Sequence, residues 1–214
     1  MRKSVVAMCA FLLCGLAFAP KTLADNTDAN IFVTQDQVRV FIGSTEGMNA
    51  SQAQKYNETQ SDLLNRLASS ASHSIGPALV TFNDFLTIEE IESVAQSIRE
   101  INTVYIWMPG RDGRAIIDVA NNDLNVTIND FFESLNIEDL HNSDYKNDML
   151  ALINNYGIFA LEIKAEYSVL QSLSKLPGVR SVDVIQSEAA VAMASQVEKP
   201  ISYICIPEKP DGTA

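Results

Sequence analysis

Cysteine is scarce in this chain, which has only three in 214 residues. Cys9 and Cys14 lie in an N-terminal segment that we expect to be removed, so the mature chain would keep Cys205 alone. No intramolecular disulfide could then form, although small extracellular domains without a sufficient core depend on such bridges. The sequence therefore predicts a fold held by packing. It favours an exported bacterial protein over a eukaryotic extracellular module.

Basic residues are also few, with 15 Lys and Arg against 27 Asp and Glu. Removal of Arg2, Lys3 and Lys21 would leave 12 basic against 27 acidic residues, a formal charge of −15. Such a surface repels phosphate backbones and anionic lipid head groups. We therefore expect no nucleic-acid partner and no membrane association of the mature chain. The charge is compatible with a basic partner.

The chain has one long apolar run, and it is short for a membrane span. Residues 5–19 follow the basic pair Arg2 and Lys3, and small residues precede Asp25. This arrangement is typical of a cleaved secretory signal peptide. We expect cleavage after Ala24 and a periplasmic or secreted location. An uncleaved N-terminal anchor is the alternative.

Motifs for catalysis, metals or cofactors are lacking. The only histidines, His73 and His141, stand in polar connections without neighbouring ligands, as expected for solvated surface residues. There is no Gly-rich phosphate loop and no nucleophile elbow. Cys205 stands between isoleucines, as a small buried hydrophobic residue would. We therefore predict no cofactor, no metal and no catalytic residue.

The most legible pattern lies in residues 156–186. Apolar and polar residues alternate over 159–164, which indicates a half-buried strand with Phe159 on its apolar face. Apolar residues then follow helical spacing over 169–176, and the alternation returns over 181–184. The segment therefore predicts a strand, a helix and a strand. Its polar positions, Glu162 and Asp183, are expected on the solvated face.

A second unit of the same kind spans residues 78–108. It begins with a short buried strand over 78–82, and Thr87 with Glu90 then forms a capping box at a helix start. The returning strand over 104–108 is apolar on both faces, which indicates an interior position. The sequence thus contains two strand-helix-strand units.

The other segments surround these two units. We expect a strand over 38–42 and a surface helix from Asn49 to about 71 with a narrow apolar stripe. A Ser-rich connection is expected over 69–77, and helices in an insertion over 121–156. Residues 187–196 are compatible with a weakly packed helix, and 201–206 with a last strand.

The predicted fold is α+β, a ferredoxin-like split βαβ sandwich. In this arrangement each unit leaves a gap between its parallel strands that a strand of the other unit fills, closing one sheet over a single core with the helices on one face. The expected divisions are a signal peptide (1–24), an N-terminal strand and surface helix (25–77), the main domain (78–186, insertion 121–156) and a C-terminal tail (187–214).

Residues 156–186 resemble the second half of the propeptide-type inhibitors of subtilisin-like proteases. The residues that carry the resemblance are Gly157, Ala160, Leu170, Leu173, Pro177, Gly178, Val179 and Val182. The resemblance implies a ferredoxin-like fold and inhibition by a docked sheet with an extended tail in the active cleft, for which residues 187–214 would serve. The chain departs from the family's pattern in that its first half does not match the family's opening strand and an insertion separates the two halves.

The candidate binding surface is the tip of a hairpin predicted at Asp112-Gly113. Trp107, Met108, Arg111 and Arg114 bring the only tryptophan and two arginines together in an acidic chain. Trp and Arg are enriched where interfaces carry most of the binding energy. The alternative is that Trp107 belongs to the core and that the arginines neutralise nearby acids.

These observations favour an exported, non-enzymatic protein that binds another protein. Inhibition of a protease is the more specific version of this hypothesis. A carboxylate-dependent hydrolase of the cell envelope is the alternative, because carboxylates distant in sequence can meet in a cleft. A structural homo-oligomer formed by pairing of edge strands is the third.

Overall fold

The computed structural model describes residues 30–45, 47–95, 98–108, 113–119 and 157–210. Its largest sheet has five strands in the order β5 (Gly113–Asp118), β4 (Glu100–Met108), β6 (Ile158–Glu166), β3 (Ile75–Leu86) and β7 (Val179–Val184). All neighbouring pairs are antiparallel. Consequently β3 and β4 run parallel with β6 between them, and β6 and β7 run parallel with β3 between them. The predicted α+β class is confirmed.

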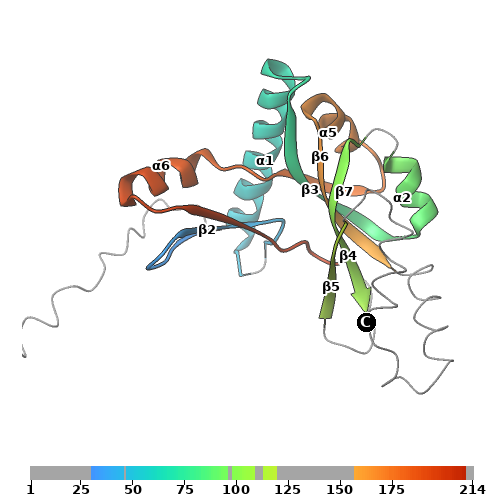
Figure 1. Ribbon diagram of the computed structural model, residues 1–214, viewed down its shortest axis with the longest axis horizontal. Helices are drawn as coiled ribbons and strands as arrows, with labels where there is room; N and C mark the ends of the chain where they lie inside the picture. Colours follow the sequence, from blue (N-terminus) through green and yellow to red (C-terminus); the bar gives the residue numbers. More distant parts are fainter. Residues whose placement is uncertain (1–29, 46, 96–97, 109–112, 120–156, 211–214) are drawn as a thin grey trace, which may run out of the picture.

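A smaller sheet consists of β1 (Ile31–Val33), β2 (Val38–Ile42) and β8 (Ile201–Cys205). Strand β2 pairs antiparallel with β1 and parallel with β8. Together with α6 (Glu188–Val197), this sheet extends to one side of the molecule, whereas α2 (Ile88–Ala95) lies at the opposite end (Figure 1). The two ends of the described chain therefore meet in one sheet.

The described part of the chain contains two apolar cores, one on each face of the five-stranded sheet. The first contains Val80 and Leu161 from the strands, together with apolar residues of α1 (Ala50–Ser70), α2 and α5 (Tyr167–Leu173). The second contains Leu79 and Phe159 with residues of β2 and α6. The prediction of a single core with all helices on one face is therefore wrong, because α6 and the small sheet cover the other face.

A β-bulge in β6 separates Phe159 from the residues with which the sequence groups it. Tyr105 pairs with Ala160 and Ile106 with Ile158, so Phe159 has no registered partner on β4. An extra residue of this kind reverses the facing of the side chains beyond it. Phe159 accordingly packs in the second core, while Leu161 packs in the first.

Strand β3 begins at Ile75, within the stretch predicted to be a loop over 69–77. Gly76 and Pro77 pair with Ala165 and Lys164 of β6. The proline is tolerated because the registered pairing with β7 begins only at Ala78. A Cβ on Gly76 would lie 2.4 Å from the Tyr167 hydroxyl oxygen, so close packing explains the glycine. The expected boundary at 77/78 thus falls inside a strand.

The segment expected to be a C-terminal tail is folded for most of its length. Residues 188–197 form α6, which Ser187 caps by accepting from the Ala190 amide at 3.1 Å. Residues 201–205 form β8, which the register pairs with the whole of β2. The predicted helix and last strand are confirmed, and the prediction of a tail from residue 187 is wrong. The signal peptide, the insertion over 121–156 and Arg111 lie outside the described residues.

Helix α1 starts at a capping box, which offers a first test of the fold. The Asn49 side chain accepts from the Gln52 amide at 3.0 Å, and the Gln52 side chain accepts from the Asn49 amide at 2.9 Å. Replacing Asn49 by alanine should lower the free energy of unfolding by about 1 kcal/mol, because the Gln52 amide loses the side-chain oxygen that accepts from it. Urea denaturation would measure it. Asp62→Ala, at an exposed position inside the helix, should change it by less than about 0.5 kcal/mol.

Candidate functional site

Helix α1 lies along β7, the outermost strand at one edge of the large sheet. Its buried face carries two polar residues, Tyr56 and Gln60, ahead of Leu63 and Leu64. The Gln60 side-chain oxygen accepts from the Val184 amide at 3.1 Å, so it satisfies a donor of the edge strand. The leucines meanwhile pack in the first core. This arrangement fixes the polar half of α1 beside the end of β7.

Asp183 is buried next to this polar half of the helix, with only 2% of its surface exposed. The Ser181 hydroxyl donates to its carboxylate at 2.8 Å, and the Tyr56 hydroxyl forms a second hydrogen bond to it. The same Tyr56 oxygen accepts from the Gly43 amide at 2.8 Å. Both of these hydrogen-bond partners of the carboxylate, among the residues that the structure describes, are neutral hydroxyls.

Glu208 forms the opposite wall with the loop after β2. Its carboxylate accepts from the Thr45 amide at 2.6 Å and from the Thr45 hydroxyl. An Arg180 guanidinium nitrogen lies 4.0 Å from Glu208 and donates to the Lys209 carbonyl at 3.1 Å. These contacts attach the segment after β8 to β7 and to the loop.

Between these elements lies an open cleft with a volume of about 460 Å³. It is lined by Gly43, Thr45, Tyr56, Asn57, Gln60, Ser61, Leu64, Asn65, Thr81, Ser174, Arg180, Ser181, Val182, Asp183 and Glu208. Thr81 is 1% exposed, and its hydroxyl has no hydrogen-bond partner among the described residues. The cleft therefore combines a polar lining with two buried polar groups, Thr81 and Asp183.

Burial dominates the electrostatics of the cleft. It raises the pKa of Asp183 to about 6, the nearby Glu208 charge acts in the same direction, and the bonds from Ser181 and Tyr56 oppose both. Burial and the Asp183 charge raise the pKa of Tyr56 well above its usual range, so the phenol remains a donor. At neutral pH the cleft therefore holds a buried carboxylate whose hydrogen-bond partners among the described residues are the neutral hydroxyls of Ser181 and Tyr56.

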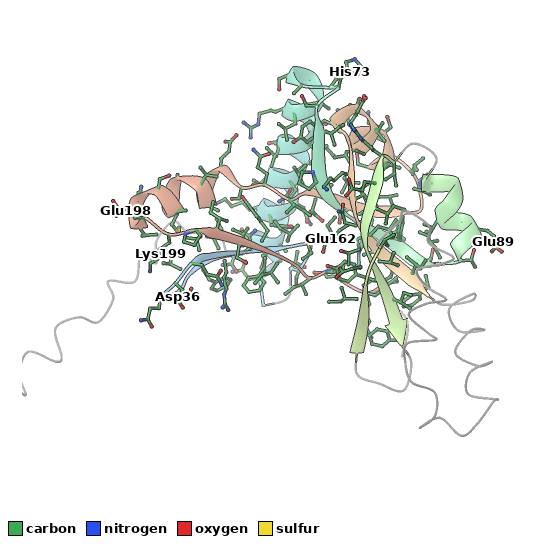
Figure 2. The ribbon with its side chains drawn as sticks, in the orientation of Figure 1. Asp36, His73, Glu89, Glu162, Glu198 and Lys199 are labelled. Carbon is green, nitrogen blue, oxygen red and sulfur yellow. The ribbon has the colours of Figure 1, made fainter. Side chains whose placement is uncertain are left out.

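A second polar cluster lies between the two sheets. The Tyr105 hydroxyl donates to the Glu162 carboxylate, and Cys205 of β8 also hydrogen-bonds to it. Burial and the Glu162 charge raise the pKa of the Cys205 thiol well above its usual range, so the thiol stays protonated and unreactive. Figure 2 shows Glu162 near the middle of the molecule.

The prediction that Glu162 and Asp183 occupy a solvated face is wrong. They lie opposite Leu79 in the register, and that face of the sheet is covered by the second core. A signal for this was present in the sequence. The strand over 104–108 is apolar on both faces, which implies that both faces of its sheet are covered.

The structure describes the predicted hairpin surface in part. Trp107 is half-buried against the second core, and the Lys209 ammonium lies 4.6 Å from the centre of its ring. Trp107 pairs with Arg114 across β4 and β5, and Met108 with Gly113, so the predicted hairpin forms. Arg111 and the side chains of Met108 and Arg114 lie outside the described part.

His73 is exposed at the far end of α1, where its ring nitrogen lies 3.1 Å from Glu166 (Figure 2). It is remote from the cleft, as expected of a surface histidine. His141 lies outside the described residues. Within the described ranges, no group of three or more His, Cys, Asp or Glu side chains could hold a metal ion. No helix in those ranges is long and apolar enough to cross a membrane.

Comparison with known proteins adds no relative. No family model matches the chain, and neither a curated protein nor a solved structure matches it.

Proposed function

We propose that the protein is an exported, non-enzymatic protein that binds another protein, and that the cleft at Asp183 is its binding site. The observation that carries this proposal is the buried Asp183 carboxylate in the lining of an open cleft, whose hydrogen-bond partners among the described residues are two hydroxyls. A buried charge without a cationic partner destabilises the folded state. A buried carboxylate that lowers stability in this way and lies in a concave site is a candidate functional group.

The partner is expected to be basic where it enters the cleft. The lining holds two acidic groups, Asp183 and Glu208, and one basic group, Arg180, so its balance of charge is negative. The mature chain as a whole would carry a formal charge of −15. Charge of one sign steers an oppositely charged partner towards its site and repels others.

The proposal can be tested by capture of the partner from envelope extract with the mature protein as bait. Ser61→Arg places a long charged side chain in the cleft lining, and Thr59→Arg places the same side chain on an exposed position outside it. A specific partner should bind the wild type and Thr59→Arg. The purified partner should bind Ser61→Arg at least tenfold more weakly, because the cleft is blocked and has lost negative potential. Absence of any specific partner, or equal binding by Ser61→Arg, would contradict the proposal.

A carboxylate-dependent hydrolase is the second candidate, and one observation favours it. Two carboxylates, Asp183 and Glu208, line the same cleft, and the pKa of about 6 at Asp183 suits a general acid. Against it, Glu208 is bonded to the amide and hydroxyl of Thr45, so one of the two carboxylates is already engaged within the protein. Hydrolysis of envelope polymers that disappears in Asp183→Asn would establish this candidate.

We further propose that the large sheet and its helices form a ferredoxin-like split βαβ sandwich. The strand order β4-β6-β3-β7 supports this interpretation. Inhibition of a subtilisin-like protease is the sharper form of the binding function, in line with the resemblance of residues 156–186. Because α6 and β8 are folded, such an inhibitor would dock by a surface and not by a long extended tail.

A homo-oligomer is the remaining alternative. Strands β1 and β8 are the two edges of the small sheet, and Phe32 of β1 is half exposed. Edge strands of this kind can pair between copies. Light scattering would distinguish a monomer from such an assembly.

A further inference from the structure

Thr81, Ser181 and Asp183 lie together on one face of two neighbouring strands. The register places Thr81 opposite Ser181 and Leu79 opposite Asp183. Directly opposed residues point to the same side of a sheet, so Asp183 is the diagonal neighbour of Thr81. Diagonal neighbours are about 7–8 Å apart. One small group that donates to both side chains can bridge such a distance.

Both side chains have acceptor capacity that the described residues leave unfilled. The Thr81 hydroxyl is buried and lacks a hydrogen-bond partner in the described part of the chain, which is uncommon for a buried polar atom. The Asp183 carboxylate can accept about four hydrogen bonds, and Ser181 and Tyr56 supply two. Among the described residues, these two side chains therefore lack further donors, because the Arg180 guanidinium in the same lining lies beside Glu208 and donates to the Lys209 carbonyl.

We infer that the floor of the cleft binds a primary ammonium group, which donates to the Asp183 carboxylate and the Thr81 hydroxyl. This inference rests on the proposed function, in that it takes the cleft as the binding site. An ammonium carries three donors and a full positive charge on one compact atom. It would compensate the buried charge and satisfy the orphan hydroxyl together.

Other ligand groups fit the same floor less well. A guanidinium binds carboxylates best as a bidentate fork, but Ser181 and Tyr56 already occupy part of the Asp183 carboxylate. An anion would be repelled by Asp183 and Glu208, and the Arg180 guanidinium in the same lining is engaged by Glu208 and the Lys209 carbonyl. A neutral hydroxyl could donate to either acceptor, but it would leave the buried charge uncompensated.

The pH dependence of binding provides a second test of the ammonium site. Protonation of Asp183, whose pKa is about 6, removes the charge that attracts the ammonium. Among the described residues, the other titratable groups that face this carboxylate are Tyr56 from α1, Glu208 from the C-terminal segment and Cys205 from β8, and the charged Arg180 of β7 lines the same cleft beside Glu208. The pKa values of the phenol and the thiol are raised, so both stay neutral below pH 8. Binding should therefore weaken as the pH falls from 7.5 to 5.

Calorimetric titration of the purified chain with four probes tests the inference. The probes are acetyl-Gly-Lys-Gly-amide, the same peptide with norleucine, the same peptide with 6-hydroxynorleucine, and the free diamine cadaverine. At pH 7.5 the lysine peptide should bind at least tenfold more tightly than either neutral peptide. Asp183→Asn should abolish that preference, and Thr81→Val should weaken lysine binding severalfold. At pH 5 the preference for lysine should be reduced.

The results of the titration can contradict the ammonium site without contradicting the binding of a protein partner. Equal affinity for the lysine and hydroxyl peptides, or an unchanged preference in Asp183→Asn, would overturn the ammonium site even if a protein partner is captured. Binding of cadaverine without the lysine peptide would support the ammonium site and identify a small amine in place of a protein side chain. Absence of binding by all four probes would overturn it. A melting curve of each variant confirms that it is folded.

Discussion

Asp183→Asn should raise the free energy of unfolding at pH 8 by about 3 kcal/mol, the equivalent of a shift in pKa from 3.8 to about 6. The asparagine has the same shape and carries no charge to desolvate. The hydroxyls of Ser181 and Tyr56 can rotate, so each can accept from the amide nitrogen or donate to the amide oxygen. Chemical denaturation of both proteins from pH 4 to 8 would measure the difference.

The pH dependence of the difference follows from the direction of the shift. The folded state holds the Asp183 proton more tightly than the unfolded chain does, because burial raises the pKa of this carboxyl. The contribution of Asp183 to stability is therefore most favourable below about pH 4 and is lost as the pH rises through about 6. The asparagine variant lacks this loss, so the two stability curves should converge at low pH and separate at high pH.

Other carboxylates contribute to the free energy of unfolding with the opposite pH dependence. Their contributions cancel when the curve of the wild type is subtracted from that of the variant. Lys164 lies 2.8 Å from Glu100 and lowers its pKa, so that contribution is present at neutral pH and is lost on acidification. It is common to wild type and variant and cancels in their difference. Asp118→Asn, at an exposed position of the same sheet, should change stability by less than about 0.5 kcal/mol at every pH.

If Asp183→Asn destabilises the protein at pH 8, the carboxylate stabilises the fold, and the prediction that its burial lowers the free energy of unfolding is wrong. Asp183→Ala is a further contrast, because it leaves Tyr56 and Ser181 without their partner and should destabilise the protein. If asparagine stabilises the fold and also removes the preference for ammonium, the cleft exchanges stability for binding. Sites that bind charged ligands commonly show this trade-off.

Much of the secondary structure could be predicted from local patterns. The strand over 38–42, the helix after Asn49 and the capping box at Thr87 are all present in the structure. Each depends on residues close in sequence, such as the 2.8 Å bond from the Thr87 amide to Glu90. Periodicity and capping chemistry report such short-range interactions directly.

The candidate site could not be predicted in the same way, because it depends on pairings between distant residues. Asp183 lies in an alternating strand, where a polar residue normally faces water. Its burial follows from the small sheet, which forms only when β8 pairs with β2, about 160 residues earlier in the chain. Tyr56 and Glu208 reach the cleft from further segments that no local pattern connects. The hairpin that carries Trp107 could be predicted because its two strands are close in sequence.

Phe159→Ala should lower the free energy of unfolding by about 3–5 kcal/mol, the usual cost of deleting a buried aromatic ring. Phe159 is fully buried in the second core. Its ring forms edge-to-face contacts with Phe85 and Tyr105, with centres 6.1 and 6.3 Å apart. The cavity would open between the two sheets, so this substitution tests the second core specifically. Phe32→Ala is the matched control, since Phe32 is 50% exposed and its ring packs edge-to-face against Phe41. It should cost about 1 kcal/mol.

The same experiment tests whether the two cores unfold as one unit. Trp107, the only tryptophan, packs against the second core, whereas most of the helical signal comes from α1 on the first. Because β3, β4 and β6 contribute side chains to both cores, fluorescence and circular dichroism should report one coincident transition in the wild type and in Phe159→Ala. An early fluorescence transition in the variant, with the helical signal unchanged, would mean that the small sheet and α6 melt separately. The cleft would then be lost before the rest of the fold, because Glu208 reaches it only through β8.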